Sequence, residues 1–150
     1  MISDTHGLLR PEALDFLTGC DHIVHGGDIG GPDILERLGG LAPLTVVRGN
    51  NDTAAWQRAL PETARVAVGG VVLYVIHDLK AMDIDPAGAG VHVVVSGHSH
   101  RPGSSRRDGV LYVNPGSAGR RRFSLPISAG ELRIDGGGVH ARLVTLVEMA

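Results

Sequence analysis

Five short polar blocks are spread along the chain, and each follows a run of apolar residues. An apolar run that ends in a polar block is typical of a buried β-strand followed by a loop. Loops at the ends of neighbouring strands can converge, so the blocks predict one shared dinuclear metal site. The candidate ligands are Asp4 and His6 in Ser-Asp-Thr-His-Gly, Asp28 in Gly-Gly-Asp, Asn50 in Gly-Asn-Asn-Asp, His77 in Val-Ile-His-Asp, and His98 and His100 in Gly-His-Ser-His.

The donor atoms of these blocks limit the kind of metal. Carboxylate, amide oxygen and imidazole together suit intermediate divalent ions such as Mn²⁺, Fe²⁺ or Zn²⁺. The blocks contain no thiolate, which argues against a structural zinc site.

The first part of the chain alternates strand and helix patterns. Short β-branched runs at residues 23–24 and 44–47 each end at a ligand block. Segments with helical spacing precede them at residues 11–18 and 32–38. The pattern predicts a β-α-β-α-β unit.

After Pro61 the chain is mostly strand-like. A hairpin is predicted for residues 63–68 and 71–76 around Gly69-Gly70, followed by a buried strand at 91–95 and a strand at 110–113 after the Asp108-Gly109 turn. Two more strands, 128–134 and 139–147, flank a glycine turn at 136–138. Two sheets packed face to face with helices outside them are the economical architecture.

Composition indicates one enzyme-sized domain over residues 1–150, long enough to bury about 68–70% of its unfolded surface. No stretch approaches the ~18 apolar residues of a membrane helix, and no export signal is recognisable, so the cytoplasm is the default location. The net charge of −2 gives no reason to expect nucleic acid as a partner. Apolar residues in the β-rich second half leave a homo-oligomer open.

Three local features have simple interpretations. The lone Cys20 cannot form an internal disulfide and is interpreted as a structural thiol. The basic runs at 106–107 and 120–122 are interpreted as solvated surface loops. The alternative for the second run is that one arginine reaches a phosphate, because the run follows the Asn-Pro-Gly-Ser block at 114–117.

The ordered blocks resemble the calcineurin-like metallophosphoesterase superfamily over nearly the whole chain. The family pattern runs Asp-x-His, Gly-Asp, Gly-Asn-x-(Asp or Glu), a lone His and Gly-His-x-His, and all parts are present in order. The short length and the Asn-Pro-Gly-Ser block are similar to the small single-domain bacterial and archaeal phosphodiesterases. The resemblance implies an α/β fold, a four-layer α/β/β/α sandwich of two packed mixed β-sheets flanked by helices.

The same resemblance implies two divalent ions, with Mn²⁺ favoured and iron, zinc or nickel as alternatives. It implies a metal-dependent phosphoesterase, more specifically a phosphodiesterase, in which a metal-bound hydroxide attacks a small phosphoester substrate. The catalytic residues would be Asp28, Asn50, Asn51 and His77. One metal would be held by Asp4, His6 and His100, the other by Asn50, His77 and His98, with Asp28 as the bridging carboxylate.

Two other functional classes stay open. The fold also occurs in a retromer subunit that serves as a scaffold, so the chain could be a non-catalytic scaffold or a protein-binding module. A metal could also serve only to stabilise the fold. All seven ligand positions carry competent side chains, which favours the enzyme.

The chain departs from the family pattern at Asn51. Many family members have at this position a histidine that can protonate the leaving group. An amide can orient a phosphate but has no proton to give near neutral pH. Substrates with good leaving groups are therefore favoured.

A second departure lies at the start of the chain. Only residues 1–3 precede Asp4, whereas strands usually run ~5–6 residues. Either this strand is unusually short or the natural protein begins upstream. The expected consequence is a loosely held Asp4 and His6.

Several polar residues near the blocks have two interpretations. Asp52 and Asp78 could accept hydrogen bonds from the imidazoles or from the Asn50 amide, or could simply be solvated. His25 is expected to give structural support beneath the site. The histidines outside the blocks are interpreted as surface or packing residues: His22, His92 and His140.

Overall fold

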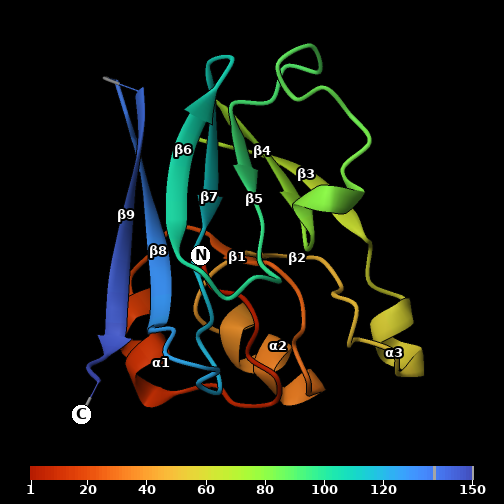
Figure 1. Cartoon of the computed structure of the whole chain (residues 1–150), viewed down its shortest axis with the longest axis vertical. Helices are drawn as coiled ribbons and strands as arrows, with labels where there is room; N and C mark the ends of the chain where they lie inside the picture. Colours follow the sequence, from red (N-terminus) through yellow and green to blue (C-terminus); the bar gives the residue numbers. More distant parts are fainter. Residues whose placement is uncertain (137, 150) are drawn as a thin grey trace.

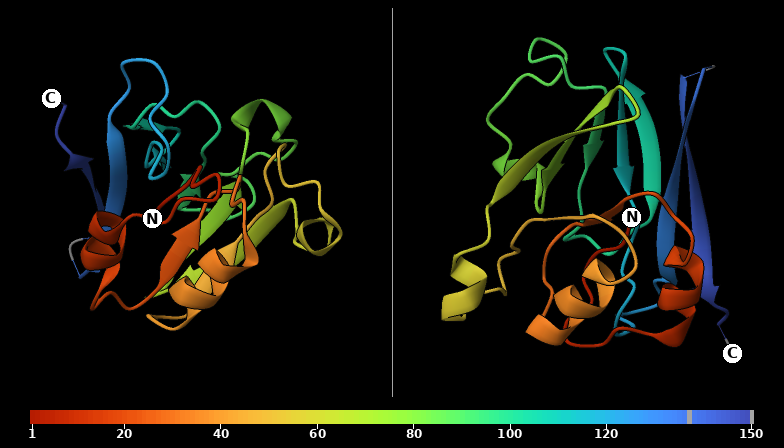
Figure 2. Two further views of the ribbon diagram at one scale, coloured as in Figure 1. Left: turned by 90° about the horizontal axis from the view of Figure 1, so that it is seen from below. Right: turned by 180° about the vertical axis from the view of Figure 1, so that it is seen from behind.

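The computed structural model describes residues 1–136 and 138–149. Part of the predicted glycine turn at 136–138 therefore lies outside the described residues. The chain forms two β-sheets that pack face to face, with both long helices on the outer side of the first sheet (Figures 1 and 2). Among the described helices, none combines the length and apolar character needed to cross a membrane.

The first sheet is assembled from both ends of the chain. Strand β1 (Ile23–His25) runs parallel to β2 (Leu44–Val46), and residues 1–3 lie on the other side of β1. Beyond residues 1–3 follow Ser117, β8 (Ile127–Asp135) and β9 (Gly138–Val147), the last two forming an antiparallel hairpin.

The second sheet has the strand order β3-β4-β5-β7-β6. The central strands β4 (Val71–Ile76), β5 (Val93–Val95) and β7 (Val110–Asn114) are parallel. The edge strands β3 (Thr63–Val68) and β6 (Gly103–Arg107) are antiparallel to their neighbours, so the sheet is mixed.

Side-chain alternation explains how the layers stack. On β4, Leu73 and Val75 face the first sheet and join the core between the sheets, whereas Tyr74 and Ile76 face outward. The outer side of the first sheet packs against α1 (Pro11–Leu17) and α2 (Pro32–Gly39). The predicted α/β sandwich of two packed sheets is confirmed.

The outer layer over the second sheet is thinner than the sequence suggests. It consists of the 3₁₀ turn η1 (Leu79–Ala81) and the loop that follows, with Met82, Ile84 and Ala89 covering the outward side chains. Pro86 and the nearby glycines prevent a regular helix here.

Two further elements escaped the sequence analysis. Helix α3 (Ala55–Arg58) is a single turn. The basic run at 106–107 was predicted to be a loop, but it ends strand β6. The prediction is wrong because the Asp108-Gly109 turn, with φ of 51° and 79°, joins two strands in a hairpin. Four of the five β6 residues are exposed, so no apolar alternation marks this edge.

The start of the chain is firmly held. The Ile2 N–H donates to the Val24 carbonyl at 2.9 Å, and the Gly130 N–H donates to the Met1 carbonyl at 2.9 Å, so residues 1–3 pair on both sides. Ile2 and Ser3 are fully buried. The expectation of loose support beneath Asp4 is wrong, because both neighbours of this short strand supply hydrogen bonds.

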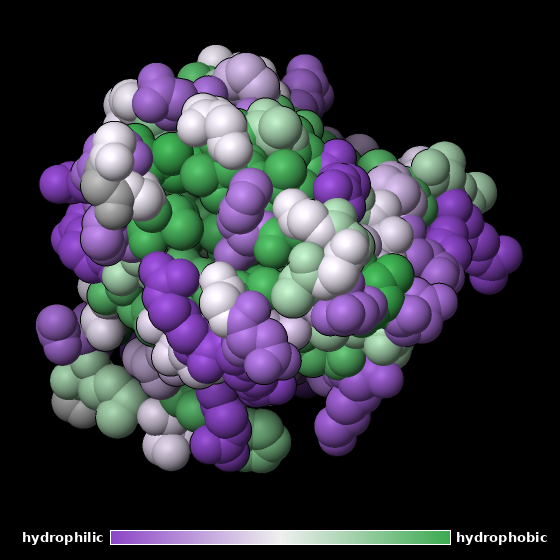
Figure 3. All heavy atoms as spheres, turned by 90° about the horizontal axis from the view of Figure 1, so that it is seen from above, coloured by the Kyte–Doolittle hydropathy of each residue, from purple (hydrophilic) through white to green (hydrophobic). Residues whose placement is uncertain are grey.

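The far end of the sandwich is more open. A cavity of about 740 Å³ lies between the sheets there, lined by apolar side chains including Val68, Leu73, Leu132 and Ile134. Figure 3 views this end, where hydrophobic residues are visible among polar ones. Cys20, a free thiol, lines the same cavity and packs against the helix-side core.

Candidate metal centre

The seven predicted ligands come together at the opposite end of the sandwich. Asp4 and His6 follow residues 1–3, Asp28 follows β1, and Asn50 follows β2. His77 follows β4, and the histidine pair follows β5. Strands that end at the same edge thus deliver side chains from five loops to one place.

The backbone is strained where these ligands lie. Seven non-glycine residues in the described chain have positive φ, and five of them are predicted ligands. Such a left-handed conformation is unfavourable for residues with a side chain and is often found at functional sites. These five predicted ligands are Asp4 (55°), His6 (45°), Asp28 (57°), His98 (68°) and His100 (60°).

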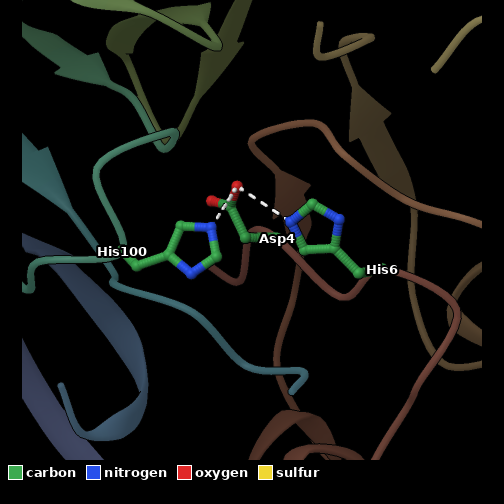
Figure 4. Close-up of side chains that lie close together, drawn as sticks. All are labelled: Asp4, His6 and His100. Carbon is green, nitrogen blue, oxygen red and sulfur yellow. Dashed lines mark ion pairs between the residues drawn. The ribbon is translucent and has the colours of Figure 1, made fainter. Parts of the chain in front are cut away.

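One group of ligands is buried around Asp4. The Asp4 Oδ1 atom lies 3.3 Å from His100 Nε2 and 3.7 Å from His6 Nε2 (Figure 4). Among the described residues, Asp4 Oδ1, His6 Nε2 and His100 Nδ1 are buried without a hydrogen-bond partner. Buried polar atoms are rarely left unpaired, so this arrangement fits a bound cation.

Asp4 is held so that only one oxygen is free. Its Oδ2 atom accepts hydrogen bonds from the Ser3 hydroxyl at 2.6 Å and from the His98 backbone N–H at 3.1 Å. Oδ1 therefore points to the histidines in a fixed orientation.

A second group joins Asp4, Asp28 and His77. The Asp28 Oδ2 atom lies 3.3 Å from His77 Nε2 and 3.7 Å from His6 Nε2. Ligand atoms of Asp4, Asp28 and His77 all lie within 4.8 Å of one another. Asp28 thus lies between the two groups of histidines.

The remaining predicted ligands, Asn50 and His98, are more exposed than His77, which is 4% exposed. The Asn50 amide oxygen lies 3.1 Å from His77 Nε2 and 3.2 Å from His98 Nδ1. The His98 side chain is 45% exposed. These three side chains converge on one point at the rim of the centre.

Electrostatics favour the ionised carboxylates. Burial alone would raise the pKa of Asp4, but contacts with His100, His6 and Ser3 hold it far below its usual range. Burial also acts to raise the pKa of Asp28, and the contacts with His77 and Asn51 outweigh it and lower the pKa. Burial lowers the pKa of His77, but its carboxylate neighbours more than compensate and raise it. Both carboxylates are therefore charged and ready to bind a cation.

A glycine makes room for His77. An added Cβ on Gly27 would lie 2.7 Å from His77 Nδ1, and the φ of Gly27 is +102°. His77 Nδ1 is 2.7 Å from the neighbouring Gly26 carbonyl, which fixes the ring so that Nε2 faces Asp28. The Gly-Gly-Asp block thus places a carboxylate and orients a histidine.

Asp52 is buried and binds backbone groups of two loops. It was predicted either to accept hydrogen bonds from the imidazoles or the Asn50 amide, or to be solvated, and neither prediction described this role. Its carboxylate accepts hydrogen bonds from the backbone N–H groups of Asp28, Ile29 and Gly49 at 2.7–2.9 Å. The Gln57 side chain donates a fourth at 3.1 Å. The side chain therefore ties the loop of Asp28 to the loop of Asn50.

Asp78 keeps to the surface beside His98. Its Oδ1 accepts from the Lys80 N–H at 3.0 Å, and its Oδ2 lies 3.8 Å from His98 Nε2. Asp78 therefore lies close to an imidazole, as one prediction stated, and is also partly solvated, as the other stated.

His25 supports the site from beneath. It is fully buried, and the Gly27 N–H donates to its Nδ1 at 3.0 Å. Its Nε2 must then carry the proton and donate to the Thr5 hydroxyl at 3.0 Å, which donates in turn to the Ile29 carbonyl at 2.7 Å. Burial lowers the pKa of His25 to about 4, in keeping with this neutral tautomer.

Thr5, Ser3 and Gln57 take part in the site but were missed by sequence reasoning. Thr5 and Ser3 flank Asp4 in the Ser-Asp-Thr-His block, which was the available signal. Gln57 has no signal in the sequence, because it reaches Asp52 only through the turn of α3.

Asn51 contacts the carboxylate of Asp28, which lies between the two groups of predicted ligands. Its backbone N–H donates to Asp28 Oδ1 at 2.9 Å, and its side-chain amide donates to Asp28 Oδ2 at 3.0 Å. The other histidines lie elsewhere: His22 contacts Thr45, His92 accepts from the Val72 N–H, and His140 is exposed on β9.

Comparison with known proteins agrees with this architecture. The Calcineurin-like phosphoesterase superfamily domain matches residues 1–137. A probable metallophosphoesterase of Methanothermobacter thermautotrophicus is 34% identical over 96% of this chain and 90% of its own length. Phosphodiesterase YfcE of Escherichia coli is 30% identical over 68% of this chain and 59% of that enzyme. The chain therefore belongs to the calcineurin-like phosphoesterase superfamily.

Solved structures show the same fold. An archaeal phosphodiesterase superposes with a TM-score of 0.76 at 19% identity, over 95% of this chain and 97% of the other. Vps29 of Entamoeba histolytica, in complex with Zn²⁺, superposes with a TM-score of 0.71 at 24% identity, over 97% of each chain. At these identities the likeness establishes the fold alone.

Proposed function

We propose that this chain is a metal-dependent phosphodiesterase that hydrolyses a small phosphoester at a dinuclear centre. The observation that carries the proposal is the buried cluster of Asp4, His6 and His100, in which Asp4 Oδ1 and His6 Nε2 face each other without hydrogen-bond partners among the described residues. Family membership supports a metal-dependent phosphoesterase. Relatives named as phosphodiesterases favour diesters over monoesters.

Each ion would have its own set of ligands. Asp4, His6 and His100 would hold the first, and Asn50, His77 and His98 the second, with Asp28 shared between them. The contacts of Asp28 support this division, since Asp28 Oδ2 lies 3.3 Å from His77 Nε2 and 3.7 Å from His6 Nε2. Oxygen and imidazole donors without thiolate favour Mn²⁺, with iron, zinc or nickel as alternatives.

The chemistry that two divalent ions supply is polarisation of the phosphoryl oxygens and a water whose pKa falls toward ~7. The chain's own residues preserve the positive charge that this requires. Asp4 and Asp28 contribute one negative charge each, while Asn50 and the ligand histidines are neutral donors. The centre thus retains net positive charge for the transition state.

Asn51 acts on Asp28 in this proposal. Its two hydrogen bonds hold both carboxylate oxygens in place. Because an amide cannot protonate a leaving group near neutral pH, esters of good leaving groups should react fastest.

The test is hydrolysis of bis(p-nitrophenyl) phosphate by metal-free protein with and without added Mn²⁺. We expect turnover only with metal, loss of turnover with chelator, and slower cleavage of a dialkyl phosphate than of the aryl diester. Asp15→Ala, an exposed change on α1, is the matched control and should behave like the parent. A folded, metal-loaded protein that turns over no phosphoester would instead favour a binding module. A cytoplasmic location and a homo-oligomer stay predictions of the sequence.

A further inference from the structure

A cavity opens directly beside the rim of the metal centre. Its volume is about 670 Å³, and its lining includes Asn50 and His77, two of the proposed ligands of the second metal. From there it extends over the outer face of β3 and β4 toward the segment around η1, past Thr63, Tyr74 and Asp83. An ester group attached to a phosphate at the metals has a direct path into it.

Among the described residues that line this cavity, Arg48 is the only arginine, and it is already paired. Arg48 Nη2 lies 2.6 Å from Glu62 Oε1, and Arg48 Nη1 donates to the Arg58 carbonyl at 2.6 Å. No lysine lines the cavity in the described part of the chain. Asp78 and Asp83 are the remaining charged groups, so the cavity carries net negative charge beyond the metal ligands.

Tyr74 gives the cavity a polar group. The residue is 8% exposed, and its ring packs with Ile76 and Val94 on the outer face of the sheet. Tyr74 also lines the cavity, and no hydrogen bond of its hydroxyl is observed among the described residues. A tyrosine hydroxyl at a cavity wall can donate to a ligand or accept from it, so the cavity fits a ligand with polar character.

We propose that this cavity binds the alcohol portion of the substrate and selects a cationic alcohol over a neutral or anionic one. The inference rests on the proposed phosphodiesterase function, because the phosphate must bind at the metals for the alcohol to reach Tyr74. Asp78 and Asp83 attract a cationic substituent and repel an anionic one. At ~7 Å in water, each unit charge changes the preference about threefold.

The experiment compares three p-nitrophenyl phosphodiesters that share one leaving group. The second ester group is 2-(trimethylammonio)ethyl, its uncharged isostere 3,3-dimethylbutyl, or the anionic 2-sulfoethyl. With Mn²⁺ at low ionic strength, we expect kcat/KM to be about tenfold higher for the cationic ester than for the isostere. The sulfoethyl ester should be slowest. The preference should fade in ~1 M salt, where the Debye length is about 3 Å.

Two variants assign the effect to the cavity. Asp83→Asn should lower the cationic preference about threefold, while Glu12→Gln removes an exposed carboxylate on α1 and should leave it unchanged. Equal kcat/KM for the three esters, or an equal effect of Glu12→Gln, overturns the inference and leaves the phosphodiesterase intact. No turnover of any ester contradicts the phosphodiesterase itself, and the inference with it.

Discussion

The proposed metal centre has a buried half and an exposed half. Asp4 is fully buried, and His100 is 4% exposed. His98, by contrast, has a side chain that is 45% exposed, and Asn50 is exposed as well. A buried, hydrogen-bonded ligand has already lost its conformational freedom before the metal binds, whereas an exposed one loses it on binding.

The supporting contacts follow the same division. Asp4 is fixed by Ser3, by the His98 N–H and by a strand paired on both sides. The side chains of Asn50 and His98 chiefly contact other ligands at the rim. The comparison reverses the expectation from the short N-terminal strand: the metal at Asp4, His6 and His100 should be the more tightly held.

The largest effect is expected at the residue that both halves share. Asp28→Ala removes the carboxylate that would lie between the two proposed cations, whose mutual repulsion would then be unscreened. Both metals should be lost at micromolar concentration, and kcat/KM should fall at least ~10³-fold. Metal analysis after gel filtration, together with diester turnover, measures the two effects. If Asp28→Asn kept two metals and full activity, Asp28 could not be the bridge.

Asp52, which joins the loop of Asp28 to the loop of Asn50, should contribute to the stability of the fold as well. Asp52→Ala leaves three backbone N–H groups and the Gln57 amide without their acceptor. Each buried unsatisfied group costs about 1–3 kcal/mol, so urea unfolding of the metal-free protein should show a loss of at least that size. Asp15→Ala, at an exposed carboxylate on α1, is the control and should change stability by less than about 0.5 kcal/mol. Equal losses in the two variants would argue against this role of Asp52.

The hydroxyl beneath the buried half should affect metal affinity more modestly. Thr5→Val keeps the shape of the side chain but breaks the link from His25 to the Ile29 carbonyl. We expect affinity at the Asp4 ion to fall by about 10-fold, as for other groups that orient metal ligands. Thr5→Ser keeps the hydroxyl and should restore most of it. An equal loss with serine would assign the effect to packing.

His25 should also make stability depend on pH. Its pKa is about 4 in the folded chain, below the usual 6.5, because burial disfavours the charged ring. The unfolded chain therefore binds the extra proton first, and the contribution is fully present above pH 6.5 and lost as pH falls toward 4. The slope is about 1.4 kcal/mol for each pH unit. His25→Gln should flatten the slope in that window, measured by urea unfolding of metal-free protein. An unchanged slope would assign the dependence to other groups.

Much of the difference between the buried and the exposed half of the proposed metal centre could not be predicted from the sequence. The blocks predicted which residues meet, because polar residues after apolar runs mark strand ends in any parallel arrangement. They could not predict burial at Asp4, which depends on Gly130 and Ala118 pairing with residues 1–3 from the other end of the chain. Asp52 was ambiguous for the same reason, since its partners become close only after folding.

The fold shows a similar contrast. Apolar alternation in β4 and β7 was readable because one face of each strand meets the other sheet. Strand β6 was not, because it lies at a sheet edge with most side chains in solvent. The layer around η1 is thin because Pro86 and the nearby glycines disfavour a helix. The family resemblance implied helices on both outer faces, so this local feature of the sequence was overlooked.

The central claim is that the buried half binds its metal more tightly than the exposed half. Calorimetric titration of the metal-free protein with Mn²⁺ tests it most directly. Ordering Asn50 and His98 on binding costs roughly 0.5–1.5 kcal/mol for each side chain, so we predict two binding events that differ at least about fivefold in affinity. His98→Ala should remove the weaker event and spare the tighter one, and Asp4→Ala should remove the tighter one. Loss of the tighter event in His98→Ala, or two equal affinities in the parent, would contradict the account.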